Sequence, residues 1–575
     1  MHEVADKGQS IVFRIMSCAA QLLIAPGLCL SLIVGQGGQA HAQTASSAND
    51  PGQIERRIRD RALPAPPREA VITPVQTPAV ATEAVEPLSV ALTGIVVEGA
   101  TAFPTATFVS TYQEYLGRVV SSRDIETILA RITRLYRDRG FFLSTAIAPP
   151  QDLLGGLVRV RVIEGYVERV AFKNAGGRAD ALRPHLDPVL AERPLTLATL
   201  ERGVLLINDL PGIGAAAQME VIDASRGTYE LVLDVEDTAA DGAFFFNNWG
   251  TDAVGPLQLW LSGGVNAGVG RGGRLQGGVF TVPNQPAELL YGELAYVHPL
   301  DRNGTFVSAG GALARINEGD GSAIDSTSQR ATVRVWHPAI RQQDQNLWLS
   351  TTFDYYNLDQ RTKGDSLVED RLRVLRAGFN YWQADPGGGS TFLVGELSQG
   401  LPILGASRSN ATNLTTYKGR SDFTKLTVSA SREQGLTRAI GIQVTAKAQK
   451  SLTRLLSAEQ FGYGGSQFGP AYDFSELVGD DGVAAGLELR FGRELDGWGL
   501  KAYQLFTGCD VGLVWNDAEG SRSVRDSLAS IGGGIRLTLA DGVLGTLQVA
   551  RGLPAFDSTS GDDVSRMSFT LSVNW

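Results

Sequence analysis

The stretch Met567–Trp575, MSFTLSVNW, alternates strictly between apolar and small or polar side chains. A period of two predicts a strand with one apolar face and one wet face. Such a strand suits the core of a soluble sandwich as well as the wall of a membrane barrel. The aromatic residue at its end favours the barrel, because a closing strand is held by the first strand and faces lipid. The apolar residues that we expect to face lipid in this closing strand are Phe569, Leu571, Val573 and Trp575.

The composition narrows the class of protein. A chain of 575 residues exceeds one compact core, so we expect two or more domains. Charged residues make up only 19% of the chain and glycines number 67, which suits closely spaced strands better than helical bundles. The net charge of −10 argues against nucleic acid as a partner.

Residues 1–42 have the form of a secretory signal peptide. Two basic residues, Lys7 and Arg14, precede an apolar stretch at about 15–34, and the small-x-small motif Ala40-His41-Ala42 follows. This order predicts cleavage directly after the motif. The alternative is a retained membrane anchor, against which a proline and a glycine inside the apolar run argue.

Residues 43–63 predict a short N-terminal helix. Asp50-Pro51 provides an N-cap and a proline at the first helical position, and Ile54 and Ile58 share one apolar face. So short a helix is marginal alone and must dock somewhere. Residues 64–88 are rich in Pro, Ala, Thr and Val, which indicates an extended linker. Helix and linker together suggest a mobile plug, and a disordered leader is the alternative.

Residues 89–165 and 166–238 predict two small α/β modules with the same order of elements. The first has a strand around Ile95, a helix that begins at Ser121 and further strands. The second repeats this order, with its helix around Val204. Exposed sheet edges of such modules can accept an extended peptide as an added strand. We therefore expect substrate binding at these edges, and a role as spacers is the alternative.

Residues 239–575 carry strand patterns without helices. The clearest example is 440–449, where apolar and polar residues alternate. Charges at alternate positions of otherwise apolar strands suit a wet lumen inside and lipid outside. At about 20 residues for each strand and connector, the segment holds about 16 strands, with longer loops such as Gly319–Ser328. The predicted fold class is mainly β, a 16-stranded transmembrane β-barrel that encloses an aqueous channel and follows two α/β modules.

Neither a catalytic constellation nor a cofactor site is predicted. His185, His298 and His337 are scattered and lack the spacing of metal ligands. No serine lies in a recognisable nucleophile motif, and no nucleotide motif is present. Removal of the signal peptide leaves Cys509 as the only cysteine, so we expect no internal disulfide. We therefore expect no enzyme, no metal and no cofactor.

Four motifs in this order resemble the haemolysin secretion/activation family of two-partner secretion transporters. They are Leu206-Ile207-Asn208-Asp209-Leu210-Pro211-Gly212, His298-Pro299-Leu300 before Asn303-Gly304, Ser398-Gln399-Gly400-Leu401 through Leu404-Gly405-Ala406, and Leu456-Ser457-Ala458-Glu459-Gln460-Phe461-Gly462 through Gly479-Asp480. The resemblance implies two periplasmic POTRA modules, a 16-stranded outer-membrane barrel and an N-terminal plug helix. It also implies nucleotide-free export of one large, unfolded, typically β-helical exoprotein.

The resemblance further implies a long loop inside the barrel, whose arginine-glycine-tyrosine tip pairs with an aspartate on the inner wall. Here the matching tip is Gly469-Pro470-Ala471-Tyr472-Asp473, and the matching aspartate is Asp510. Pro470 stands in the place of the arginine, so the charge-assisted pair is missing. Because a buried aspartate without its partner is costly, Asp510 must find another cation, stay hydrated or be protonated. We expect the loop to enter the lumen and to be held by Tyr472 and backbone contacts, and a surface loop is the alternative.

The expected location is the outer membrane of a Gram-negative bacterium, with the modules in the periplasm. The expected partners are a secreted exoprotein client, outer-membrane lipid and the barrel-assembly machinery, which would recognise the C-terminal strand. Three alternatives to export stay open: an outer-membrane insertase or assembly factor of the same superfamily, a diffusive porin, and an outer-membrane hydrolase. The client itself is not identified by the sequence.

Overall fold

The computed structural model of the chain describes two modules and a barrel. The described residues are 53, 72–73, 89–152, 154–251, 254–266, 272–317, 324–408, 411–495, 499–516, 524–553 and 564–575. The predicted signal peptide, and all but one residue of the predicted plug segment, lie outside these ranges. Among the described residues, no helix is long and apolar enough to cross a membrane.

The first module has helices packed against a three-stranded sheet of order β3-β6-β5. Its elements are β2 (Ser89–Ala91), β3 (Gly94–Glu98), α3 (Val109–Tyr112), β4 (Val119–Ser121), α4 (Ser122–Asp138), β5 (Thr145–Ile147) and β6 (Leu157–Ile163). β3 runs parallel to β6, and β5 runs antiparallel to it. Val158, Val160 and Val162 of β6 are buried, whereas the arginines between them are exposed, which confirms the predicted half-exposed strand.

Helix α4 begins where the sequence predicts it. The Ser121 hydroxyl accepts a hydrogen bond from the Asp124 N–H, and the Asp124 carboxylate accepts one from the Ser121 N–H, which is a capping box. Ile128, Ile132 and Tyr136, spaced at helical intervals, are at most 1% exposed. The helix therefore covers the sheet with the apolar face that its periodicity indicates.

The second module repeats the plan. Its elements are β7 (Tyr166–Lys173), α5 (Ala179–Leu182), α6 (Asp187–Ala191), α7 (Leu197–Asn208), β8 (Ile213–Asp223) and β9 (Thr228–Asp237). The sheet has the order β1-β8-β9-β7, in which β1 (Ile72–Thr73) comes from the predicted linker. Val204, Leu205 and Ile207 of α7 are fully buried against this sheet. A two-residue strand of the linker thus pairs with the β8 edge of the module.

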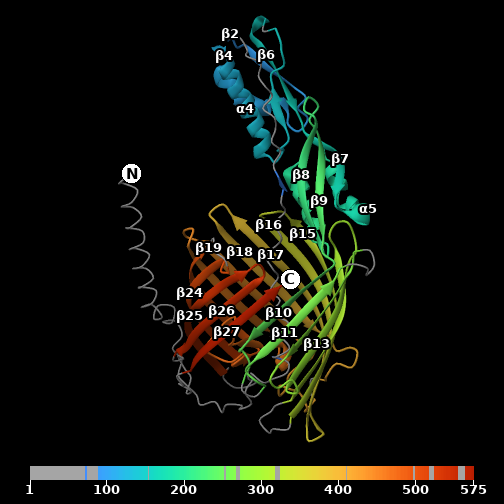
Figure 1. The fold of residues 1–575 in the computed structure, drawn as a ribbon, viewed down its shortest axis with the longest axis vertical. Helices are drawn as coiled ribbons and strands as arrows, with labels where there is room; N and C mark the ends of the chain where they lie inside the picture. The colour runs from blue at the N-terminus through green and yellow to red at the C-terminus, as the bar shows by residue number, and fades with distance from the viewer. Residues whose placement is uncertain are drawn as a thin grey trace, which may run out of the picture. The chain divides into compact units, whose positions relative to one another are not determined.

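The rest of the chain forms a closed ring, whose strands cross the wall obliquely (Figure 1). Within the described residues the ring has 16 strands, each antiparallel to its neighbours. They are β10 (Ala240–Asn247), β11 (Gln258–Val265), β12 (Arg274–Thr281), β13 (Leu289–Pro299), β14 (Phe306–Asn317), β15 (Ile324–Arg341), β16 (Gln345–Thr362), β17 (Asp365–Asp385), β18 (Gly389–Gly400), β19 (Thr424–Gly435), β20 (Ile440–Ser451), β23 (Asp481–Glu494), β24 (Ala502–Asn516), β25 (Val524–Ala540), β26 (Val543–Leu553) and β27 (Ser565–Asn574). The last strand, β27, pairs with the first, β10, and this pairing closes the ring.

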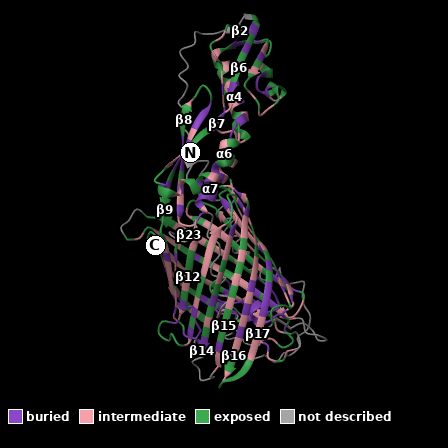
Figure 2. Cartoon of the chain, turned by 90° about the vertical axis from the view of Figure 1, so that its right-hand side faces the viewer, coloured by how far each residue is buried: buried purple, intermediate pink, exposed green. Residues whose placement is uncertain are grey.

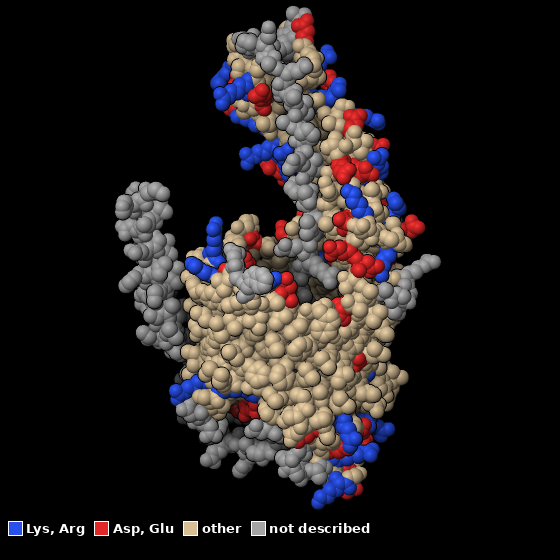
Figure 3. All heavy atoms as spheres, in the orientation of Figure 1, with Lys and Arg blue, Asp and Glu red and all other residues tan. Residues whose placement is uncertain are grey.

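The outside of the barrel is apolar and the inside is polar. Large apolar residues are the exposed ones, with Leu313 at 65% and Leu294 at 58% exposed, whereas Arg376 and Lys425 are buried. Exposed residues recur along the barrel strands (Figure 2). On the face shown in Figure 3, the middle of the barrel wall carries few charged side chains, and most charged side chains lie beyond it on both sides. This inverted pattern is the one that lipid outside and water inside require.

The strand count and the fold class are confirmed, but individual strands are less uniform than expected. β12 has 8 residues and β17 has 21, against the predicted span of about 10. The loop expected at Gly319–Ser328 is partly wrong, because β15 already begins at Ile324. Ser326 and Ser328 pair with β14 and are buried, so their small polar side chains belong to the inner face of a strand rather than to a turn.

Candidate functional site

Residues 452–480, between β20 and β23, form the candidate functional site. The segment contains a 3₁₀ turn at Ser457–Glu459 and a hairpin of β21 (Phe461–Tyr463) with β22 (Leu477–Gly479). Apolar residues of the segment form one cluster with residues of four neighbouring barrel strands, β23 to β26. The residues of that cluster are Phe461, Tyr463, Phe468, Ala471, Tyr472, Leu477, Ala484, Val514, Leu528 and Ala550.

The segment contacts the inner face of the wall. On β24, Asp510, Gly512 and Val514 contact it, whereas Leu513 between them is 39% exposed on the opposite face. Successive side chains of a strand point to opposite faces, so the contacting residues belong to one face. Cys509 is exposed on the other face.

Asp510 accepts hydrogen bonds from three neutral groups. Its Oδ1 atom lies 2.6 Å from the Gly469 N and 2.5 Å from the Tyr463 hydroxyl. The Ser530 hydroxyl lies 3.1 Å from both carboxylate oxygens. Among the residues that the structure describes, no lysine or arginine lies within ion-pair distance of Asp510. The carboxylate is therefore satisfied by hydrogen bonds from neutral groups.

Glycines on the wall make room for the aromatic rings of the segment. A Cβ atom on Gly512 would overlap the ring of Tyr463, and one on Gly482 would overlap Phe461. A Cβ on Gly552 would lie 2.6 Å from the Tyr472 hydroxyl oxygen. Because these glycines lie on three strands, β24, β23 and β26, the wall is shaped to receive the segment along its length.

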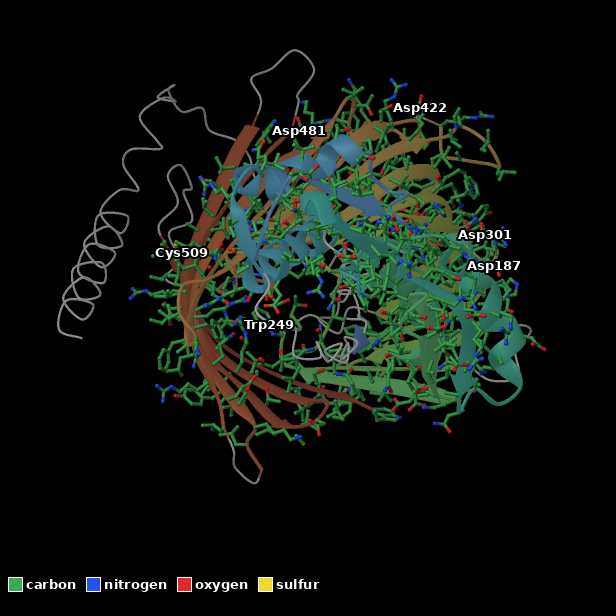
Figure 4. All side chains as sticks on the ribbon, turned by 90° about the horizontal axis from the view of Figure 1, so that it is seen from above. Asp187, Trp249, Asp301, Asp422, Asp481 and Cys509 are labelled. Atoms are coloured by element: carbon green, nitrogen blue, oxygen red, sulfur yellow. The ribbon has the colours of Figure 1, made fainter. Side chains whose placement is uncertain are left out.

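The tip of the segment lies against the strand that closes the ring. The Tyr472 hydroxyl donates to the Ala529 carbonyl oxygen at 3.0 Å. Arg566 on β27 donates to the Tyr472 carbonyl oxygen at 3.1 Å and lies 2.7 Å from the Asp473 carboxylate. Its guanidinium also covers the ring of Trp249, 5.3 Å from the centroid. Seen along the barrel, Trp249 lies within the ring of strands, whereas Cys509 lies at the wall (Figure 4).

The other end of the segment is held by buried charges. Both carboxylate oxygens of Glu459 are paired, one with Arg376 at 2.5 Å and the other with Lys425 at 2.7 Å. Arg376 lies on β17 and also contacts Asp354 on β16 at 2.9 Å. These four side chains are at most 6% exposed. The turn at Ser457–Glu459 is thus fixed to strands on a different part of the ring from β27.

The predicted plug segment contributes one described residue to the site. Gln53 is 1% exposed, and its side chain donates to the Ser457 carbonyl oxygen. It also accepts a hydrogen bond from the Ser475 hydroxyl at 2.9 Å. Ile54 and Ile58, the residues predicted for the plug face, lie outside the described residues.

Sequence reasoning identified part of this site. The structure brings Gly469, Tyr472 and Asp473 to the wall, and Pro470 and Ala471 are buried with them. The sequence reasoning missed four further residues of the site, Arg566, Arg376, Lys425 and Gln53. An arginine at an inward position of the last strand, out of phase with the apolar face of that strand, is a signal that could have indicated Arg566.

The module edges and the closing strand are also placed. β8 pairs in parallel with β1 at Ile72–Ala217 and Thr73–Gln218, so one predicted binding edge holds a strand of this chain. Phe569, Leu571 and Val573 are half-buried and Trp575 is 68% exposed, while Ser568 and Ser572 between them are buried. Within the described residues, no group of His, Cys, Asp and Glu side chains could hold a metal ion.

Comparison with known proteins identifies relatives of both regions. Residues 90–165 match the family of ShlB-type POTRA domains, and residues 315–537 match the haemolysin secretion/activation protein family ShlB/FhaC/HecB. The heme/hemopexin transporter protein HuxB of Haemophilus influenzae is 22% identical over 452 residues, which cover 77% of this chain and 79% of HuxB. The outer membrane transporter CdiB of Escherichia coli is 24% identical over 404 residues, covering 68% of this chain and 67% of CdiB. The solved structure of CdiB from Escherichia coli superimposes with a TM-score of 0.72 at 19% identity, covering 93% of this chain and 100% of CdiB.

Proposed function

The chain belongs to the haemolysin secretion/activation family, whose members are outer-membrane transporters of two-partner secretion, and we propose that it exports one large unfolded exoprotein by the following route. The client enters from the periplasm, passes through the barrel and folds outside. Folding outside biases the movement outward, because a folded chain cannot return through the pore. The step needs no nucleotide and no enzyme activity of this chain.

The observation that carries this proposal is a closed ring with a polar inner face and a folded segment against that face. A ring of 16 strands is wide enough for an aqueous channel rather than a packed core. An extended polypeptide can stay hydrated along such a wall, because Arg330, Thr332 and Arg334 follow each other at every second position of β15. Segment 452–480 is the in-barrel loop of this proposal, and Asp510 is its partner on the wall.

The client binds first at a module edge. β8 of the second module supports this step, because its edge already pairs with an extended strand, Ile72–Thr73. A client strand that replaces these two residues would gain the same backbone hydrogen bonds. The linker would be released at the same time, and the plug segment to which it leads could then leave the pore.

Movement of the plug requires the bonds of Gln53 to break. Gln53 joins segment 43–63 to the in-barrel loop through Ser457 and Ser475, one on each side of the loop tip. The predicted plug face, Ile54 and Ile58, follows Gln53 directly in the sequence. Withdrawal of the plug and a change in the loop are therefore linked in this proposal.

The remaining assignments complete the proposal. Residues 1–42 are removed as a signal peptide. The apolar outer face of the barrel contacts outer-membrane lipid, and the alternation at Phe569–Trp575 is recognised by the barrel-assembly machinery. The two modules lie in the periplasm, as in the family.

Export is tested by comparing culture supernatants of a strain that carries the gene with those of a deletion strain. We expect one large protein to disappear from the supernatant after deletion, and to return with the gene. Outer-membrane proteins should assemble normally in both strains, whereas accumulation of unassembled barrels would favour the insertase. A serine reagent should leave export unchanged, and its inhibition would favour the hydrolase. A supernatant that does not change in any growth condition that expresses the gene contradicts the proposal.

A further inference from the structure

The in-barrel loop of this chain lacks the arginine that the family resemblance implies. Ion pairs between side chains nevertheless attach the loop to the wall at two places. We propose that the polarity of this attachment is reversed, so that the loop supplies carboxylates and the wall supplies cations: Arg566 holds Asp473, and Arg376 with Lys425 holds Glu459. This inference rests on the proposed export function, because it concerns the loop that lies in the export path.

Arg566 can replace the missing arginine because it binds the tip at two points. One nitrogen, Nη1, donates to the Tyr472 carbonyl oxygen and to the Asp473 carboxylate. The other, Nη2, donates to the Gly250 carbonyl oxygen at 2.9 Å, beyond the end of β10. A planar guanidinium fixes the direction of such bonds as well as their strength. Arg566 therefore positions the tip against both strands of the ring closure.

The environment of the tip pair supports a positioning role rather than a surface contact. The Arg566 side chain is 16% exposed, and the ring of Trp249 shields one of its faces. The Asp473 side chain is 38% exposed, so the pair is partly open to solvent. A contact of this kind holds a loop in place, and it can be released without exposing a fully buried charge.

Glu459 provides the second attachment, at the start of the loop. Arg376 donates to both oxygens of its carboxylate, at 2.5 and 3.2 Å, and Lys425 lies 2.7 Å from one of them, so two cations hold the side chain. Lys425 also donates to the Glu459 backbone carbonyl oxygen at 2.7 Å. Loss of this carboxylate would remove the ion pairs of Glu459 with Arg376 and Lys425, all at most 6% exposed, which makes this attachment stronger than the partly exposed one at the tip.

The two attachments differ in place as well as in strength. Glu459 is fixed to β17 and β19, whereas Asp473 is fixed to β27. Glu459 and Asp473 are 14 positions apart in the sequence. We infer from this order that the tip is the end that moves, while the turn at Glu459 stays in place.

The test measures the position of the loop directly, without a client. Ala471, 1% exposed, is replaced by cysteine in a Cys509→Ser background, and labelling by a membrane-impermeant maleimide is followed in the purified protein. Arg566→Gln should raise the labelling rate about tenfold, the effect of one partly exposed ion pair with its hydrogen bonds. Arg536→Gln is the matched control, because Arg536 is an ion-paired arginine of β25 whose partners Glu488 and Gln504 are both on the wall.

A double variant tests whether the two residues act through each other. Asp473→Asn should raise the rate as Arg566→Gln does, and the double variant should be labelled no faster than the faster single variant. Multiplied rates in the double variant would overturn the pairing. So would an unchanged rate in Arg566→Gln and Asp473→Asn, or an equal rise in Arg536→Gln.

The second attachment has its own variants. Glu459→Gln should increase labelling more than Arg566→Gln does, and Glu488→Gln, a wall carboxylate paired with Arg536, should not. Loss of the heat-modifiable band would show that Glu459→Gln does not assemble, and Lys425→Gln is then the milder change to test. Lys425→Arg keeps the cation, so its labelling rate should stay near that of the background. Equal labelling of Lys425→Gln and the background would overturn this attachment. Failure of the labelling test leaves export intact, whereas loss of export with normal labelling points to the proposed function instead.

Discussion

Helix α4 of the first module and the strands of the barrel wall place the same kinds of residue on opposite sides. In α4, Ile128 and Ile132 are at most 1% exposed and the charged residues face outward. In the wall, Leu313 is 65% exposed and Arg376 is 5% exposed. Each region follows its own solvent, because the module lies in water and the wall separates lipid from water. An exposed leucine therefore means different things in the two regions.

A charge on each exposed apolar surface tests this comparison with the largest effect. Leu313→Arg puts a cation on the lipid face of β14, where we expect a loss of about 2–4 kcal/mol in barrel stability. Leu157→Arg changes a leucine of β6 that is 49% exposed, and we expect less than about 0.5 kcal/mol. Urea titration of the full-length protein measures both: the heat-modifiable band follows the barrel, and resistance of the first module to protease follows Leu157→Arg.

The paired design removes the exposed fraction as an explanation. Both leucines are among the exposed apolar residues, and both lie in strands. If Leu157→Arg were as damaging as Leu313→Arg, the difference in solvent would not be the cause, and the barrel would not face lipid at position 313.

The inner face of the wall is not polar throughout, because the in-barrel loop forms an apolar cluster with part of it. Gly512→Ala should displace the Tyr463 ring, at a cost of about 1–3 kcal/mol for an overpacked contact. We expect the loop to shift and the conductance of the protein in planar bilayers to rise.

Gly545→Ala is the control for this glycine. A Cβ on Gly545 of β26 meets no atom within 4 Å, so the conductance should stay at the wild-type level. Equal conductance of Gly512→Ala and wild type would mean that the ring of Tyr463 does not determine the position of the loop.

Periodicity explains why so much of the fold could be predicted from the sequence. The alternation in 440–449 and in Phe569–Trp575, and the helical spacing of Ile128, Ile132 and Tyr136, depend only on neighbours along the chain. The pair Arg566–Asp473 spans 93 residues and Arg376–Glu459 spans 83. Such pairs depend on the order and register of strands around the ring, which local patterns do not determine. The absence of an arginine at Pro470 was visible, but its replacement was not.

The hydrogen bonds of Gln53 to the in-barrel loop allow a further test inside the barrel, with a smaller expected change in stability. Gln53→Ala removes the hydrogen bonds to Ser457 and Ser475, worth about 1 kcal/mol in total. We expect more frequent channel openings in planar bilayers, because the closed state loses this contact. Gln345→Ala, which removes a hydrogen bond to the Tyr381 hydroxyl at the wall, should leave the openings unchanged. Fewer openings in Gln53→Ala would contradict the proposed plug.

The smallest effect is expected where the second module meets the barrel. His185 is 7% exposed, and its Nδ1 lies 2.8 Å from the Arg302 carbonyl oxygen, in the turn after β13. Burial lowers the pKa of His185, although the Arg302 carbonyl oxygen and the nearby Asp301, Asp187 and Asp209 oppose this shift. The folded state therefore binds the proton less readily than the unfolded state.

A lowered pKa fixes the sign of the pH dependence. The contribution of neutral His185 to stability is fully present above its ordinary pKa of about 6.5, and it is lost as the pH falls through the lowered value. We expect the full-length protein to become more sensitive to protease between the second module and the barrel as the pH is lowered from 7.5 toward 5. His185→Gln keeps a donor for the Arg302 carbonyl oxygen but does not titrate, so its sensitivity should change less over this range. A variant with the same pH dependence as wild type would show that another group at this contact is the one that titrates.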